Sequence, residues 1–150
     1  MELKSTTYHL DGDGYRVAYW QSGSPLAKKV LFCVHGLLGR SRDFDELIEA
    51  LRDDFLCIAI DLPGRGQSDW LKQPEQYSPE SYLPAISAVL NAVDNRPVHW
   101  VGTSLGGILA MAAASLKLAN IEKLVLNDVG CHIPKASLQR IAAYVKDPLF

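Results

Sequence analysis

Short apolar runs alternate along this chain with longer segments whose apolar residues recur every three or four positions. The runs occupy residues 30–34, 55–60, 97–101 and 123–127. Continuous apolar runs of four to six residues predict strands that are buried on both faces, as in a parallel sheet.

The segments between these runs predict helices. Residues 41–52 predict a helix whose apolar residues fall on one face, and Ser41 is its candidate N-cap. Ser78 and Pro79 are typical of a helix start, and that helix is expected to reach about Asn95. Two further helices are expected at 108–118 and after Pro134.

Two β-rich segments open the chain, at 6–10 and 15–20, with the turn sequence Asp-Gly-Asp-Gly between them. This pattern predicts a β-hairpin, in which His9 is expected to be an exposed strand residue. Strands that alternate with helices then predict the α/β class, with a mostly parallel sheet and helices on both faces.

The predicted strand at 97–101 leads into Gly102-Thr103-Ser104-Leu105-Gly106, which is followed by an Ala- and Leu-rich segment. Strand, Gly-x-Ser-x-Gly and helix in this order predict a nucleophile elbow, a sharp turn that exposes the serine hydroxyl. Gly102 and Gly106 leave room for neighbouring backbone. The N-terminus of the helix favours negative charge near Ser104.

Other polar residues also follow predicted strands. His35-Gly36 follows the first apolar run, 61–68 follows the second, and Asp128 follows the last. Because functional groups of parallel sheets gather beyond the carboxyl ends of the strands, these residues are expected to lie with Ser104 at one edge. The Gly-x-Gly within 61–68 opens no helix and has no third glycine, which argues against a dinucleotide site.

Composition narrows the function classes. The chain has 150 residues, 48% of them hydrophobic, and a net charge of −2 with scattered basic residues, which argues against nucleic-acid binding. No apolar segment approaches the roughly 20 residues of a membrane span, and the N-terminus does not resemble a signal peptide, so we predict a cytoplasmic protein. The three cysteines, Cys33, Cys57 and Cys131, fit neither a disulfide framework nor a metal site. No cofactor is expected.

Four motifs together make the chain similar to the α/β-hydrolase-fold superfamily: His35-Gly36, the segment 61–68, Gly102-x-Ser-x-Gly106, and Leu-Val-Leu-Asn-Asp ending at Asp128. The resemblance implies that Ser104 is the nucleophile. It implies an oxyanion hole made by the backbone N–H groups of Leu105 and Leu37. His35, Gly36, Gly102 and Gly106 would support these groups.

In this superfamily the triad follows the order serine, acid, histidine. The resemblance places the histidine, and usually the acid, after strands beyond residue 150, although Asp128 is a candidate acid. Its alternative role is to order the turn that follows. His99 lies about 16 Å from Ser104 along an extended strand, at ~3.3 Å per residue, which is too far for a base. His35 and His132 stay open, either as bases or as structural and surface residues.

The resemblance also implies a domain organisation. Residues 1–130 correspond to the N-terminal part of the hydrolase core, truncated before its last strands, and 131–150 to the start of a helical cap. The strand at 123–127 is then expected to be an apolar edge. The 150-residue chain alone is expected to have little activity.

The preferred hypothesis is a serine hydrolase that cleaves a small-molecule carboxylic ester or related acyl substrate through an acyl-enzyme on Ser104. The alternative is a non-catalytic protein of the same fold that binds a ligand or a partner.

Overall fold

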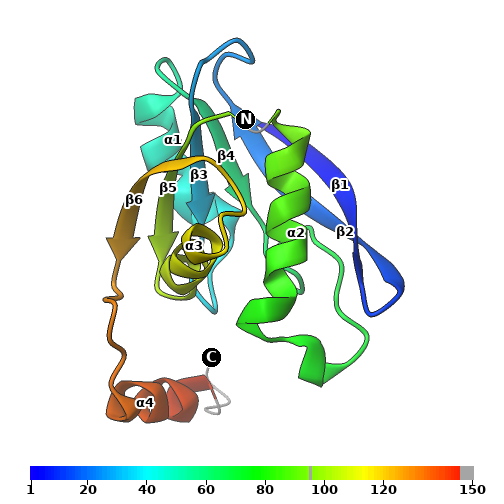
Figure 1. Ribbon diagram of the computed structural model, residues 1–150, viewed down its shortest axis with the longest axis vertical. Helices are drawn as coiled ribbons and strands as arrows, with labels where there is room; N and C mark the ends of the chain where they lie inside the picture. The colour runs from blue at the N-terminus through cyan, green and yellow to red at the C-terminus, as the bar shows by residue number, and fades with distance from the viewer. Residues whose placement is uncertain (95, 146–150) are drawn as a thin grey trace.

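A computed structural model describes residues 1–94 and 96–145 and shows a single six-stranded sheet in the order β1-β2-β4-β3-β5-β6 (Figure 1). The strands β3 to β6 run parallel, and the hairpin β1–β2 adds an antiparallel edge. The strands are β1 (Glu2–Leu10), β2 (Asp13–Ser22), β3 (Val30–Val34), β4 (Leu56–Ile60), β5 (Val98–Thr103) and β6 (Ile121–Asn127). This arrangement confirms the predicted α/β class.

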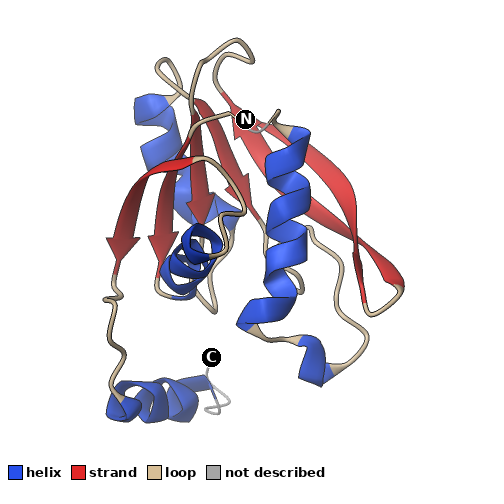
Figure 2. Ribbon diagram, viewed as in Figure 1, coloured by secondary structure: helices blue, strands red, loops and turns tan. Residues whose placement is uncertain are grey.

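Helices cover both faces of the sheet (Figure 2). They are the 3₁₀ helices η1 (Ser41–Phe44) and η2 (Pro74–Gln76) and the α-helices α1 (Asp45–Leu51), α2 (Pro79–Ala92), α3 (Leu105–Ser115) and α4 (Lys135–Val145). The first three α-helices pack on the sheet, whereas α4 lies beyond the carboxyl ends of β5 and β6 (Figure 1).

Alternate residues of the central strands build two separate cores. Phe32 and Trp100 face α2 and α3 and meet edge to face, with 4.8 Å between their ring centroids. Leu31 and Cys33 belong to a smaller cluster with Phe44 and Ile48 on the other face. Because β3 and β4 are buried on both faces, they read as continuous apolar runs.

The predicted helix at 41–52 is present over residues 41–51, but it is capped differently. It consists of η1 followed by α1, and the prediction that Ser41 is its N-cap is wrong. The backbone N–H of Ser41 donates to the buried carboxylate of Asp61 at 2.9 Å, and the Ser41 hydroxyl has no hydrogen-bond partner. The cap is one residue earlier, at Arg40, whose backbone N–H donates to the Asp43 carboxylate at 3.0 Å.

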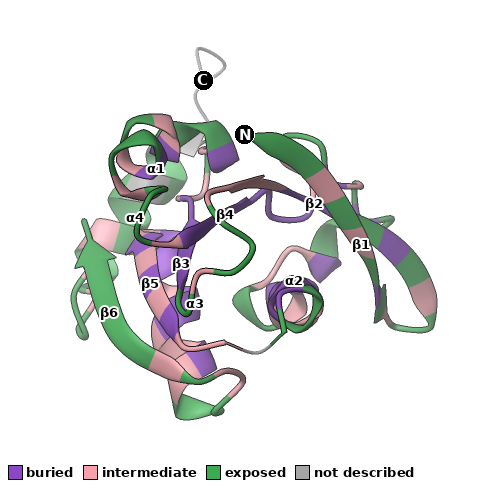
Figure 3. Ribbon diagram, turned by 90° about the horizontal axis from the view of Figure 1, so that it is seen from above, coloured by how far each residue is buried: buried purple, intermediate pink, exposed green. Residues whose placement is uncertain are grey.

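The last strand also differs from expectation. We predicted a buried strand at 123–127 that would also form an apolar edge of the sheet. The structure confirms the edge but not the burial, because Leu124, Val125 and Leu126 of β6 are 38%, 53% and 36% exposed. Within the described residues β6 pairs only with β5, so its outer side has no neighbouring strand. Figure 3 shows this exposed edge beside the partly buried β5.

Other elements follow the predictions closely. Ser78 caps α2 by accepting a hydrogen bond from the Ser81 N–H at 3.3 Å. This helix ends at Ala92, before Asp94 adopts a positive φ of 64°, and its predicted end at Asn95 lies outside the described residues. Cys33 and Cys57 are buried, and burial raises the pKa of the Cys57 thiol to about 11.

The described residues show neither a helix suited to a membrane nor a metal-binding cluster. None of the helices that the structure describes combines the length and the apolar character that a bilayer-spanning helix requires. Across residues 1–94 and 96–145, no three side chains of the metal-binding types lie together in a way that would hold an ion.

Candidate active site

Ser104 lies at a strained turn between β5 and α3. Its φ of 50° and ψ of −110° lie outside the regions that non-glycine residues ordinarily adopt, at a cost of about 1–3 kcal/mol. The Ser104 carbonyl accepts bonds from the N–H groups of Gly107 and Ile108 at 2.9 and 3.1 Å, so the helix begins immediately. The Ser104 N–H donates to the backbone carbonyl of Asn127 at 2.8 Å, and this bond connects the turn to the end of β6. These bonds hold the strained turn in place.

Two glycines allow this turn to exist. A Cβ on Gly106 would overlap the Val34 carbonyl oxygen and lie 2.6 Å from the carbonyl carbon. A Cβ on Gly102 would overlap the Gly106 carbonyl. Such separations are far below van der Waals contact, so both positions require glycine because neighbouring backbone occupies the space of a side chain.

The segment after β3 lies directly against Ser104. A Cβ built on Gly36 would lie 3.6 Å from the Ser104 Cβ, which places Leu37 beside the serine. Within the described part of the chain, the N–H groups of Leu37 and Leu105 donate to no protein acceptor. Free backbone N–H groups near a serine hydroxyl are the kind of donor that can bind an oxyanion.

His35 is fully buried beneath this segment. The Leu62 N–H donates to its Nε2 at 3.0 Å, so Nε2 is the acceptor nitrogen and Nδ1 carries the proton. Nδ1 in turn donates to the Gly36 carbonyl at 2.7 Å. Both ring nitrogens are therefore occupied by backbone groups. His35 fixes the Gly36–Leu37 peptide and has no lone pair available for the Ser104 proton.

Burial lowers the pKa of His35, with a smaller lowering from Arg65 that is opposed by the bond to Gly36 and by Asp61 and Asp43. An unfolded chain binds a proton at this residue near its ordinary value of 6.5, whereas the folded chain binds it only at lower pH. The free energy of unfolding should therefore fall as the pH drops below 6.5, by up to about 1.4 kcal/mol per pH unit from this group.

We expect the variant His35→Gln to lose this dependence, since the ionisable ring is gone. Urea unfolding at pH 7 and pH 5 measures it, with His9→Gln on the exposed face of β1 as the control. Equal pH dependence in wild type and His35→Gln would contradict the assignment of a buried neutral imidazole.

The loop 61–68 is built around the Asp61 side chain. Its carboxylate accepts bonds from the N–H groups of Ser41 at 2.9 Å and Gln67 at 3.0 Å, and it is 1% exposed. The Ser68 hydroxyl donates to the Asp61 carbonyl and accepts from the Ala18 N–H at 2.8 Å. This loop therefore joins η1, β4 and β2 at the edge of the sheet where Ser104 lies.

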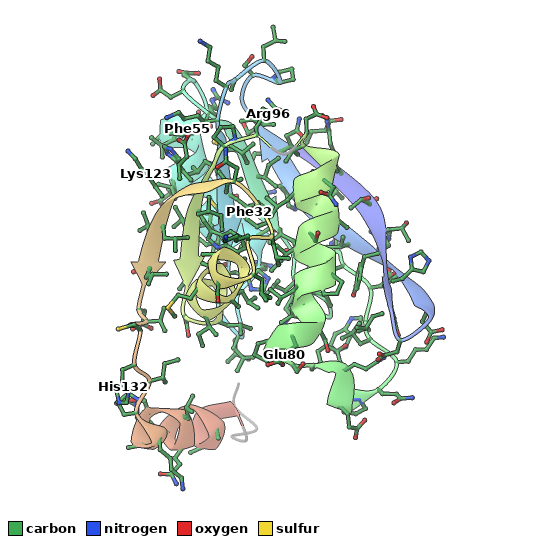
Figure 4. All side chains as sticks on the ribbon, viewed as in Figure 1. Phe32, Phe55, Glu80, Arg96, Lys123 and His132 are labelled. Carbon is green, nitrogen blue, oxygen red and sulfur yellow. The ribbon has the colours of Figure 1, made fainter. Side chains whose placement is uncertain are left out.

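A pocket of about 490 Å³ opens beside Ser104. Its lining combines residues after β6 with the first turns of α4: Asp128, Val129, Gly130, His132, Ile133, Pro134, Ser137, Leu138 and Arg140, together with Ser104 and Ile108. The structure thus brings Asp128 and His132 into one pocket with Ser104. Figure 4 shows His132 on the segment between β6 and α4.

The two remaining histidines lie elsewhere. His99 is at the other end of β5, where it contacts Phe55 and bonds to Glu122 at 3.2 Å. Figure 4 shows Phe55 at the end of the sheet opposite to His132. His9 is exposed on β1, as predicted. His132 is therefore the one histidine of the described chain that shares the Ser104 pocket.

Two site residues were missed in the sequence. Arg65 lies in the loop 61–68 and reaches the carbonyl of Leu37, 28 residues away. Arg140 lines the Ser104 pocket from α4. The position of Arg65 inside a recognised loop was the available signal for the first. Nothing in the local sequence marked the second, because it depends on where α4 lies.

Comparisons with known proteins give a consistent result. Residues 29–146 match the profile of the alpha/beta hydrolase fold. The chain is 36% identical over 135 residues to the 3-hydroxybutyrate-oligomer hydrolase of Cupriavidus necator, covering 90% of this chain and 46% of the relative.

Solved structures of alpha/beta hydrolases also superpose on this chain. An alpha/beta hydrolase from Novosphingobium aromaticivorans superposes with a TM-score of 0.82 at 35% identity, over 96% of this chain and 50% of that one. A hydrolase from Pseudomonas aeruginosa superposes with a TM-score of 0.76 at 26% identity, over 96% and 54%. The chain thus spans about half the length of the relatives it matches.

Proposed function

Because this chain belongs to the alpha/beta hydrolase fold family, we propose that Ser104 is the nucleophile of a serine hydrolase that cleaves carboxylic esters. The observation that carries the proposal is the strained φ of 50° at Ser104, held between two glycines that admit no side chain. Strain of this kind persists where the surrounding structure fixes it, and it presents the hydroxyl to the pocket.

The reaction proceeds in two steps. The Ser104 oxygen attacks the ester carbonyl while its proton passes to a general base, and the N–H groups of Leu37 and Leu105 donate to the oxyanion. Collapse expels the alcohol, which takes the proton from the base, and leaves an acyl group on Ser104. Water then attacks the acyl group by the same route and releases the acid.

Among the residues that the structure describes, His132 is the one histidine in the Ser104 pocket that could act as the general base. We propose that a histidine from the other half of the hydrolase fold performs this role, because both nitrogens of His35 are occupied and His132 is exposed. Asp128 is a candidate for the acid that orients such a histidine, since it lines the pocket. We also assign residues 131–145, the described part of 131–150, to the start of a cap over the pocket.

His132→Ala separates these two sources of the base. In the full-length protein we expect ester hydrolysis by this variant to stay within about twofold of wild type. A loss of two or more orders of magnitude would instead identify His132 as the base.

The pocket lining suggests a class of ester. Its lining includes four aliphatic side chains, those of Ile108, Val129, Ile133 and Leu138, and one cation, Arg140, beside the polar residues Ser104, Asp128, His132 and Ser137. A short hydroxyacid ester has an aliphatic chain and a terminal carboxylate, which matches this combination. The 3-hydroxybutyrate oligomers named for the Cupriavidus necator relative are of this class.

The substrate proposal predicts an effect of Arg140→Gln that depends on substrate charge. For a 3-hydroxybutyrate dimer, we expect KM to rise about fivefold, because an exposed ion pair worth about 1 kcal/mol is lost. For uncharged p-nitrophenyl butyrate, KM should stay unchanged. Equal effects on both esters would contradict a role of Arg140 in binding the carboxylate. They would not affect the proposal that Ser104 is the nucleophile.

A further inference from the structure

We propose that Arg65 is a positioning residue that holds the Leu37 segment in the geometry required of an oxyanion-hole donor, a role that rests on the proposed hydrolase function. Its guanidinium bonds to three acceptors. Nε donates to the Leu37 carbonyl at 3.2 Å, and Nη1 donates to the Pro63 carbonyl at 2.7 Å and to the Tyr82 hydroxyl at 2.8 Å. One side chain thus joins the segment after β3, the loop 61–68 and α2.

The guanidinium is itself held firmly. Its central carbon lies 5.2 Å from the centroid of the Tyr82 ring and 5.8 Å from that of Tyr77. A cation at these distances from aromatic faces is attracted to them. Tyr82 is 2% exposed, so its hydroxyl is a fixed anchor rather than a mobile one. Arg65 therefore transmits the position of the α2 core to the loop beside Ser104.

Two consecutive peptide planes meet at Leu37, and Arg65 holds the second of them. The Gly36 carbonyl is held by His35 Nδ1 at 2.7 Å and by the Gly39 N–H at 3.1 Å, and this peptide carries the Leu37 N–H. The next peptide carries the Leu37 carbonyl, to which Arg65 donates. Because each peptide is planar, the first plane sets the direction of the Leu37 N–H, and holding the second plane restricts rotation about φ and ψ of Leu37, so that the first plane stays in place.

Side-chain packing holds only part of this turn. The Leu37 side chain is half-buried and packs against the main core, whereas the Leu38 side chain is 68% exposed. Polar contacts with the backbone complete the support of the turn, and Arg65 supplies the contact to the second plane. Lysine cannot replace it, since one ammonium cannot reach three acceptors with the planar fork of arginine.

The test compares Arg65→Met with Arg96→Met in the full-length protein. Arg96 is a matched control because its Nε bonds to the Val93 carbonyl and its Nη1 to the carbonyls of Pro25 and Ala27, at 2.8–3.1 Å. It lies at the opposite end of the sheet from His132 and α4 (Figure 4). Both variants lose an arginine that binds three acceptors, but only Arg65→Met affects the loop at Ser104.

Two readouts are measured. The first is kcat for p-nitrophenyl butyrate per active site, titrated with a fluorophosphonate. We expect Arg65→Met to lower kcat about tenfold with KM within about twofold, because an oxyanion donor acts in the transition state, and Arg96→Met to leave kcat unchanged. The second is the pair of amide NMR resonances of Leu37 and Gly39, which should shift or broaden in Arg65→Met and not in Arg96→Met.

The outcomes are distinguishable. A kcat loss no larger than that of Arg96→Met, or unchanged Leu37 and Gly39 resonances in Arg65→Met, would overturn the positioning role. Failure of the wild-type protein to react with the fluorophosphonate would defeat the proposed hydrolase function, and with it the link to an oxyanion. The NMR comparison would still decide whether Arg65 holds the Leu37 segment.

Discussion

Replacing Ser104 by alanine is expected to lower kcat for ester hydrolysis by the full-length protein by a factor of at least about 10⁴. The variant keeps the N–H groups of Leu37 and Leu105 and the pocket, so it can still bind an ester and polarise its carbonyl. It has no hydroxyl to form the acyl-enzyme, and only direct attack by water remains.

The fold should tolerate this change. Ser104 is partly buried, and the hydrogen bonds that fix the turn are made by its backbone, so Ser104→Ala should unfold with a free energy within about 1 kcal/mol of wild type. Ser115→Ala, at the exposed end of α3, serves as the control and should keep full activity. Comparable turnover by Ser104→Ala and wild type would remove the serine from the mechanism.

The second large effect is on stability. Gly106→Ala should lower the free energy of unfolding by at least about 3 kcal/mol, because its Cβ would overlap the Val34 carbonyl oxygen where α3 crosses the end of β3. Either the helix or the strand must move, and both belong to the core. Denaturant unfolding followed by circular dichroism measures the loss.

Gly130→Ala is the matched control for this change. The nearest atom to a Cβ on Gly130 is the His132 carbonyl oxygen, at 3.9 Å, an ordinary van der Waals distance. This variant should unfold with a free energy within about 0.5 kcal/mol of wild type. If Gly106→Ala were equally mild, the close approach of α3 and β3 would be contradicted.

Much of this architecture could be predicted because local patterns were consistent with each other. The runs at 30–34 and 55–60 are buried on both faces, so their composition alone indicated central strands. The elbow was recognisable because its two glycines and its serine are required by backbone geometry within five residues. In both cases the physical cause lies within a short stretch of sequence.

The features that escaped prediction depend on distant partners. The backbone N–H of Ser41 bonds to Asp61, 20 residues away, and Arg65 acts on Leu37 from another loop. β6 has the composition of a buried strand but is exposed, because burial depends on neighbours that its own residues do not reveal. Long-range contacts of this kind leave little trace in a single sequence.

If Ser104 is a reactive nucleophile, covalent labelling will detect it. The full-length protein is treated with a fluorophosphonate, its intact mass is measured, and the modified peptide is sequenced. The account predicts the mass gain of one phosphonyl group on Ser104 in wild type and no gain in Ser104→Ala. A folded wild-type protein that gains no mass, or gains it on another residue, would contradict the account.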